Sequence, residues 1–113
     1  MAISNIENIT RLRGIILNEL LPLIDDDFSL LDIPYHNNIG DSLIYFGELE
    51  LFKQVSRFKL IYKSSARYGD INEIPNRGIL LLHGGGNFGD IWHESHDFRR
   101  KIIGERPNQK III

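Results

Sequence analysis

The chain of 113 residues contains no cysteine, which excludes a disulfide-stapled scaffold and a zinc site built on thiolates. No apolar run approaches the roughly 18 residues that a membrane-spanning helix needs. Residues 1–23 carry Glu7, Arg11, Arg13 and Glu19, so they lack the uncharged core of a secretory signal peptide. A net charge of −2 leaves no basic excess for nucleic acid. We therefore expect a soluble, cytoplasmic protein with no nucleic-acid partner.

The composition is that of an ordinary globular domain, with 42% hydrophobic and 25% charged residues and no repeat or low-complexity tract. Ser4 and Glu7 have the spacing of a capping box. Apolar residues then recur at helical spacing at Ile6, Ile9, Leu12, Ile16 and Leu20. The pattern predicts a leading helix over 5–21, within a leading segment 1–24.

The remaining residues, 28–113, alternate between apolar runs and amphipathic segments. The runs predict strands at 28–33, 58–62, 79–82 and 110–113, and the amphipathic segments predict helices at 41–55 and 91–103. A helical turn is expected near 71–74. Gly104 and Pro107 are expected to end the last helix, and Arg99, Arg100 and Lys101 to favour its C-terminal dipole. This order predicts an α/β, Rossmann-like parallel sheet flanked by helices.

The chain stops inside its last aliphatic strand, Lys110 to Ile113. An open strand at a sheet edge invites pairing with another chain. We therefore expect 1–113 to be a single, incomplete domain of a longer polypeptide. Pairing of copies through the open edge, as a homo-oligomer, stays an alternative.

Ligands of open parallel sheets bind at the carboxyl ends of the strands, where loops 35–41, 64–70 and 83–90 fall. The last is the most informative, because His83 is followed by Gly84, Gly85, Gly86, Asn87, Phe88, Gly89 and Asp90. Successive glycines expose backbone amides that can bind an anion. The segment matches neither the dinucleotide fingerprint nor a P-loop. We expect a ligand-facing loop, with a purely structural turn as the alternative.

The first loop offers Asn38, Gly40 and Asp41, where Asp41 is expected to cap the following helix and free amides attract an anion. An ordinary strand-to-helix turn explains these residues equally simply. Gly47 is expected to bring that helix close to the sheet.

Several side chains are weaker candidates. His83 ends a buried strand and suits a polar contact, a general acid–base group or a structural hydrogen bond. Arg67 suits an anion, and Trp92 suits packing or sugar stacking. His93 and His96 share a helix face, but no third ligand has matching spacing, so we expect no metal and no cofactor.

Two stretches together carry a family resemblance. Asn38, Ile39, Gly40 and Asp41 before an apolar helix resemble the N-x-G-D segment of polysaccharide pyruvyl transferases. The stretch from Gly84 to Trp92 resembles the G-G-G-N-x-G-D-x-[WY] segment of the same family.

The resemblance implies a bacterial enzyme that transfers pyruvate from phosphoenolpyruvate to a sugar of an exopolysaccharide or cell-wall glycan, free or lipid-linked. It implies the N-terminal half of a two-domain glycosyltransferase-B-like fold, cytoplasmic or peripheral at the inner membrane face. Taken together with the residues discussed above, the resemblance leads us to expect substrate binding by Asn38, Gly40, Asp41, His83, Gly84, Gly85, Gly86, Asn87 and Asp90, with Arg67, Trp92 and His93 as weaker candidates. It assigns no catalytic residue to this chain, so the fragment alone is expected to be inactive.

Two other interpretations stay open. A nucleotide-sugar glycosyltransferase fits the glycine segment nearly as well. A non-catalytic α/β module that binds a ligand or a partner chain fits the incomplete domain.

Overall fold

The structure is a computed structural model that describes residues 4–35, 39–54, 57–67, 69–84 and 93–113. Its helices are α1 (Asn5–Leu20), α2 (Ile39–Phe52) and α3 (His93–Glu105), with short 3₁₀ turns at Leu21–Leu23 and Ile71–Glu73. Its strands are β1 (Phe28–Leu31), β2 (Leu60–Ser64), β3 (Ile79–Leu82) and β4 (Ile111–Ile112).

The four strands form one parallel sheet, as the alternating pattern predicts, and their order in the sheet is β2-β1-β3-β4. β1 and β3 lie in the middle, and every residue of both is buried. Their unbroken aliphatic sequences are typical of strands that are covered on both faces. Phe28 pairs with Ile79, and Leu31 pairs with Leu82, so the two strands end level with each other.

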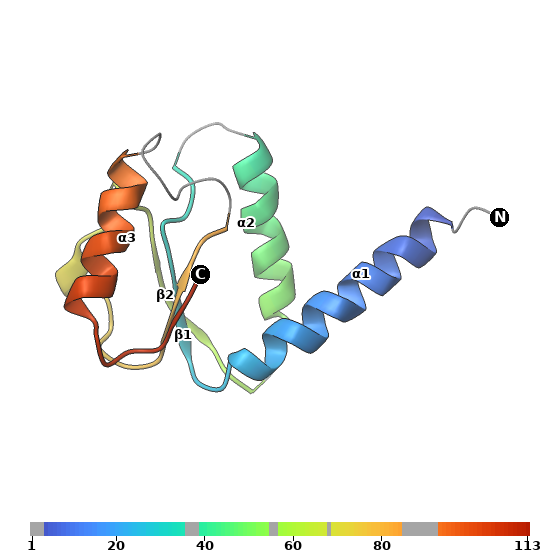
Figure 1. Ribbon diagram of the computed structural model, residues 1–113, viewed down its shortest axis with the longest axis horizontal. Helices are drawn as coiled ribbons and strands as arrows, with labels where there is room; N and C mark the ends of the chain where they lie inside the picture. Colours follow the sequence, from blue (N-terminus) through green and yellow to red (C-terminus); the bar gives the residue numbers. More distant parts are fainter. Residues whose placement is uncertain (1–3, 36–38, 55–56, 68, 85–92) are drawn as a thin grey trace.

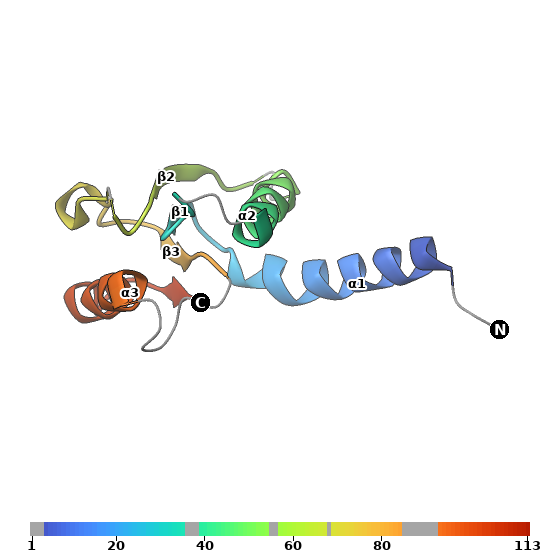
Figure 2. The same ribbon diagram turned by 90° about the horizontal axis from the view of Figure 1, so that it is seen from above.

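The helices α2 and α3 cover opposite faces of the sheet (Figure 1). On the α3 face, Leu31, Leu80 and Ile102 are fully or almost fully buried together with the Ile71–Ile74 turn. On the α2 face, Phe28, Leu30 and Ile79 form the buried cluster, against which Tyr45 and Phe52 pack. The view from above shows the sheet between the two helices (Figure 2).

Asp27 joins the amino ends of three strands. Its carboxylate accepts a hydrogen bond from the Lys59 amide at 2.9 Å, and its carbonyl accepts one from the Ile79 amide at 2.8 Å. Arg77 pairs with the same carboxylate at 3.1 Å. The register of β1 against both neighbours is therefore fixed where the sheet begins.

The leading helix α1 begins at the predicted capping box, with both reciprocal hydrogen bonds between Ser4 and Glu7 in place at 3.1 Å. It extends away from the sheet (Figures 1 and 2), and none of its residues is buried. Ile6, Ile9 and Leu12 are all at least half exposed. Among the described helices, none is long and apolar enough to cross a membrane.

Several predicted boundaries were wrong. Asp41 is the third residue of α2 and not its cap, since the helix begins at Ile39. Its charge still lies in the first turn, where the helix dipole favours an acid. Gly104 lies inside α3, which runs to Glu105, and β2 begins two residues later than predicted. A Cβ added at Gly47 would meet no atom within 4 Å, so this glycine does not mediate close packing on the sheet.

We predict that Gly78→Ala destabilises the fold, because Gly78 has a φ of +80° and an added Cβ would lie 2.4 Å from the carbonyl oxygen of Asp27. The free energy of unfolding should fall by more than about 1 kcal/mol in a urea titration. Gly104→Ala is the matched control: Gly104 lies in a helix with open space around it, so alanine should stabilise the protein by about 0.5–1 kcal/mol. Equal effects at the two glycines would contradict the turn geometry.

A second prediction concerns acid stability. The Lys59 amide, followed by Arg77, lowers the pKa of Asp27 below its ordinary value of 3.8. Its stabilising contribution is therefore complete above that value and is lost as the pH falls through the lowered pKa. In urea titrations from about pH 7 to about pH 3, Asp27→Asn should be less stable than the parent at neutral pH and converge with it in acid. Asp97→Asn, at an exposed position, serves as the control, and a constant deficit for Asp27→Asn would contradict the prediction.

Candidate functional site at the carboxyl edge of the sheet

The carboxyl ends of β1 and β3 are joined by a buried ion pair. Asp32 follows β1 directly, and its carboxylate accepts hydrogen bonds from Arg99 Nε at 2.7 Å and from Ser95 Oγ at 3.0 Å. Both charged side chains are 2% exposed. Arg99 also donates a hydrogen bond to the carbonyl of His83 at the end of β3. One guanidinium on α3 therefore ties the ends of both central strands to the helix.

Asp32 has a φ of 61°, and it is the only non-glycine residue with a positive φ in the described segments. Aspartate tolerates this left-handed conformation better than most residues. The conformation turns the chain sharply at the end of β1 while the side chain contacts Ser95 and Arg99. Such backbone outliers concentrate at functional sites.

A second polar group connects β3 to α2. One carboxylate oxygen of Glu48 accepts a hydrogen bond from the Gly84 amide at 3.0 Å. The other carboxylate oxygen lies 3.0 Å from His83 Nδ1. A carboxylate can only accept, so the ring nitrogen that faces it carries the proton. His83 is 1% exposed, and its Nε2 has no hydrogen-bond partner among the described residues.

A third group lies nearer the surface. The Tyr35 hydroxyl donates to Glu94 at 2.6 Å, and the Arg67 guanidinium lies 5.6 Å from the centre of the Tyr35 ring. The hydrogen bond to the Glu94 carboxylate raises the pKa of Tyr35 above its ordinary value, so the phenol stays protonated at neutral pH. Residues that follow β1 and β2 and begin α3 therefore meet at this edge.

The structure places the described sequence candidates in different surroundings. Gly40 and Asp41 lie in the first turn of α2, and His93 is the exposed first residue of α3. The amide of Gly84 is already hydrogen-bonded to Glu48, and Arg67 stacks on Tyr35. Five candidates lie outside the described residues, namely Asn38, Gly85, Gly86, Asn87 and Asp90, as does Trp92.

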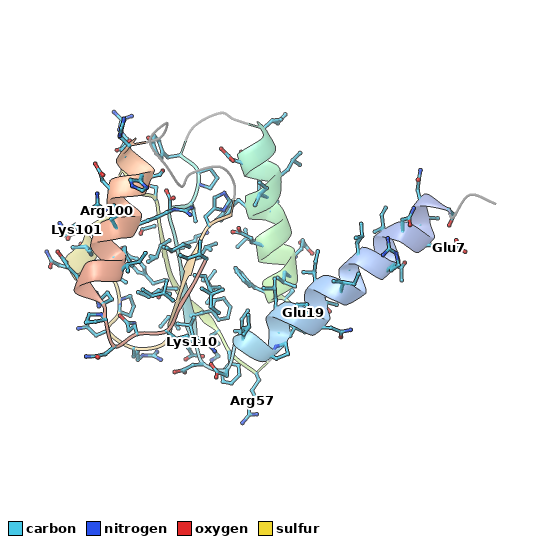
Figure 3. All side chains as sticks on the ribbon, in the orientation of Figure 1. Glu7, Glu19, Arg57, Arg100, Lys101 and Lys110 are labelled. Atoms are coloured by element: carbon cyan, nitrogen blue, oxygen red, sulfur yellow. The ribbon has the colours of Figure 1, made fainter. Side chains whose placement is uncertain are left out.

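Sequence reasoning missed three residues that organise this edge, Asp32, Glu48 and Arg99. Arg99 was expected to favour the helix dipole together with Arg100 and Lys101. The latter two point outward from α3 (Figure 3), whereas Arg99 is buried. A detectable signal was the spacing of Ser95 and Arg99, four residues apart and so on one helix face. The second signal was Asp32, an acidic residue that directly follows the buried strand β1.

Two hollows adjoin the edge. One of about 210 Å³ lies between α2 and the sheet, with Glu48 and Gly84 in an otherwise apolar lining. Another of about 450 Å³ lies beside α3 and includes Glu94, Asp97 and Lys101. No group of three His, Cys, Asp or Glu side chains that could hold a metal ion occurs within the described ranges.

Two curated proteins are similar to this chain. EpsO of Bacillus subtilis (strain 168), whose name provisionally describes it as a pyruvyl transferase, is 31% identical over 104 residues, which cover 86% of this chain and 31% of EpsO. Pyruvyl transferase 1 of Schizosaccharomyces pombe (strain 972 / ATCC 24843) is 31% identical over 88 residues, which cover 71% of this chain and 22% of that protein.

The chain is therefore similar, over most of its length, to two proteins whose names describe pyruvyl transferases. It spans under a third of the length of either relative. No family model matches the chain. One of the two relatives comes from a yeast, so kinship with pyruvyl transferases does not by itself indicate a bacterial source.

In this pyruvyl transferase relative, we predict that Asp32→Asn is strongly destabilising. Asparagine keeps the shape and tolerates the positive φ, but it removes the negative charge that faces buried Arg99. The free energy of unfolding should fall by about 3 kcal/mol. Glu50→Gln breaks an exposed ion pair with Lys53, whose side chains are 70% and 67% exposed, and should change stability by less than about 1 kcal/mol. Similar losses for the two variants in chemical unfolding would refute the assigned role of Asp32.

Proposed function

We propose that this chain forms part of a transferase that places a pyruvyl ketal, drawn from phosphoenolpyruvate, on a sugar of an exopolysaccharide or cell-wall glycan. The observation that carries the proposal is the kinship with two pyruvyl transferases over most of the chain. The parallel sheet supports it, because open sheets of this type bind ligands at their carboxyl edge. In this proposal the chain is part of the N-terminal half of a two-domain, glycosyltransferase-B-like enzyme that works in the cytoplasm, free or at the inner membrane face.

The proposed ligand contacts divide by charge. Phosphoenolpyruvate is strongly anionic and needs amides, a helix start or a cation. The backbone of the first turn of α2 at Gly40 and the guanidinium of Arg67 suit this part of the site. The Asp41 carboxylate in the same turn suits sugar hydroxyls instead. Asn38 and the glycine segment from Gly85 to Asp90 are proposed contacts on sequence grounds alone.

The glycan fits better beside Glu48 and His83. The Glu48 carboxylate already accepts the hydrogen bond of the Gly84 amide. Its negative charge therefore disfavours a phosphate at this position. Sugar hydroxyls are neutral and both donate and accept hydrogen bonds, so they suit this polar pair. We therefore place the saccharide acceptor near the end of β3.

The test compares phosphoenolpyruvate with nucleotide sugars as donors for the full-length protein. Incubation with phosphoenolpyruvate and cell-wall or exopolysaccharide glycan should release phosphate and add an acid-labile pyruvyl group, detected by mass spectrometry. Transfer from nucleotide sugars instead would favour a glycosyltransferase. Binding of glycan without transfer from either donor would favour a non-catalytic module, and both results would overturn the proposal.

We predict that Gly85→Val lowers the transfer rate by about 100-fold, because a branched side chain in the middle of the three glycines blocks ligand access to backbone amides. Gly104→Val is the matched control, since Gly104 lies on a helix with open space around it and should leave the rate within about twofold. Initial rates of phosphate release measure both. An unchanged rate in Gly85→Val would remove the glycine segment from the site.

A further inference from the structure

We propose that Glu48 is a positioning residue that holds His83 in the Nδ1–H tautomer, and that His83 Nε2 then accepts the proton of a glycan hydroxyl. The inference rests on the proposed function. It begins from two hydrogen bonds of Glu48, at 3.0 Å to the Gly84 amide and at 3.0 Å to His83 Nδ1. Both carboxylate oxygens are thus engaged, one by the strand-end imidazole and one by the residue that opens the glycine segment.

The tautomer follows from the chemistry of the pair. An ionised carboxylate has no proton to give, so Nδ1 is the donor and the lone pair of the neutral ring resides on Nε2. The same logic operates wherever a carboxylate orients an imidazole by one nitrogen and leaves the other for chemistry. Here the backbone reinforces the orientation, because the His83 amide donates to the Leu31 carbonyl at 2.9 Å and its carbonyl accepts from Arg99.

The free nitrogen is the second observation. Nε2 is buried without a hydrogen-bond partner in the described part of the chain, although the rest of the His83 polar groups are paired. Leaving a buried acceptor unsatisfied costs about 1–3 kcal/mol, so native proteins rarely retain one without a reason. A ligand hydroxyl is a donor of the right kind. Because the imidazole is 1% exposed, binding requires local opening of the edge, and the bound hydroxyl is then shielded from bulk water.

The proton balance is consistent with ketal formation. A hydroxyl oxygen bonds to C2 of the donor, its O–H bond breaks, and the proton goes to Nε2, giving an imidazolium beside the Glu48 carboxylate. When the C2–O bond to phosphate breaks, the imidazolium returns this proton to the leaving phosphate, which departs as hydrogen phosphate. When the first oxygen bonds to C2, the electron pair of the C2–C3 double bond takes a proton from water and the methylene carbon becomes a methyl group. As phosphate leaves, the second hydroxyl oxygen forms its own bond to C2, and its proton goes to water and replaces the one taken up. Electrons and charge are then conserved, with no oxidant or reductant.

The experiment uses Glu48→Gln, which changes the tautomer without much change in shape. In the variant, the oxygen of the introduced carboxamide keeps the hydrogen bond from the Gly84 amide, so its NH₂ group faces His83 Nδ1. Because NH₂ donates a hydrogen bond to Nδ1, the proton of the neutral imidazole must move to Nε2. We expect ¹⁵N NMR of histidine-labelled protein to show the Nδ1–H form of His83 in the parent and the Nε2–H form in the variant. His83→Gln identifies the resonance, and exposed His93 is the internal reference.

Steady-state kinetics distinguish a role of Glu48 in orienting His83 from a role in packing alone. Glu48→Gln should lower kcat by about 10- to 100-fold while KM for phosphoenolpyruvate changes by less than about threefold. Glu50→Gln, on the solvent side of the same helix, should change neither. A thermal midpoint within a few degrees of the parent confirms that the variant is folded.

Two results would overturn the inference, an Nε2–H tautomer in the parent protein or a full kcat in the folded Glu48→Gln variant. If the parent does not transfer pyruvate from phosphoenolpyruvate, the proposed function fails. The NMR measurement alone then decides the role of Glu48, because it needs no substrate. The two failures are therefore distinguishable.

Discussion

The buried pair of Asp32 and Arg99 is the constraint on which the carboxyl edge depends. Parallel strands lose their ladder hydrogen bonds where they end, so the loops that follow need other contacts to hold a fixed shape. Arg99 supplies them from α3, since it binds the side chain after β1 and the backbone carbonyl after β3. Buried ion pairs add little net stability over apolar packing, but moving one partner of this pair would leave the other charge buried and unpaired, which disfavours other arrangements of the edge. The value of this pair is the shape it gives the edge.

The same strand is held at both ends by an aspartate, and the two residues act differently. Asp27 lies before β1, is partly exposed and binds mainly the backbone of the neighbouring strands. Asp32 lies after β1, is buried and binds the side chains of Ser95 and Arg99 on α3. The first fixes strand register, and the second fixes α3 against the carboxyl edge of the sheet. The central strand β1 is therefore the frame against which the other elements are placed.

The sequence predicted the features that local physics determines. The capping box of α1 and the aliphatic runs of β1 and β3 were found because each depends on residues within a few positions of one another. The parallel arrangement was found because strands and helices alternate along the chain. The polar contacts of the edge were not predicted. Glu48 meets His83 across 35 positions and Asp32 meets Arg99 across 67, so no spacing rule links them. The α1 helix shows the converse: periodicity predicted an apolar face, yet that face is exposed in the described structure, because pattern alone does not supply a partner.

The Glu48 carboxylate changes how the glycine segment is best understood. Consecutive glycines suggest several backbone amides that could bind an anion. The first of them, the Gly84 amide, already donates a hydrogen bond to the negatively charged Glu48 carboxylate. Two anions at hydrogen-bond distance from one amide repel each other. A phosphate is therefore disfavoured at Gly84, and a neutral hydroxyl is favoured beside the carboxylate and His83 Nε2, which has no hydrogen-bond partner among the residues that the structure describes. Under the proposed function, the saccharide acceptor would therefore lie near β3, and the anionic donor near Arg67 and the start of α2.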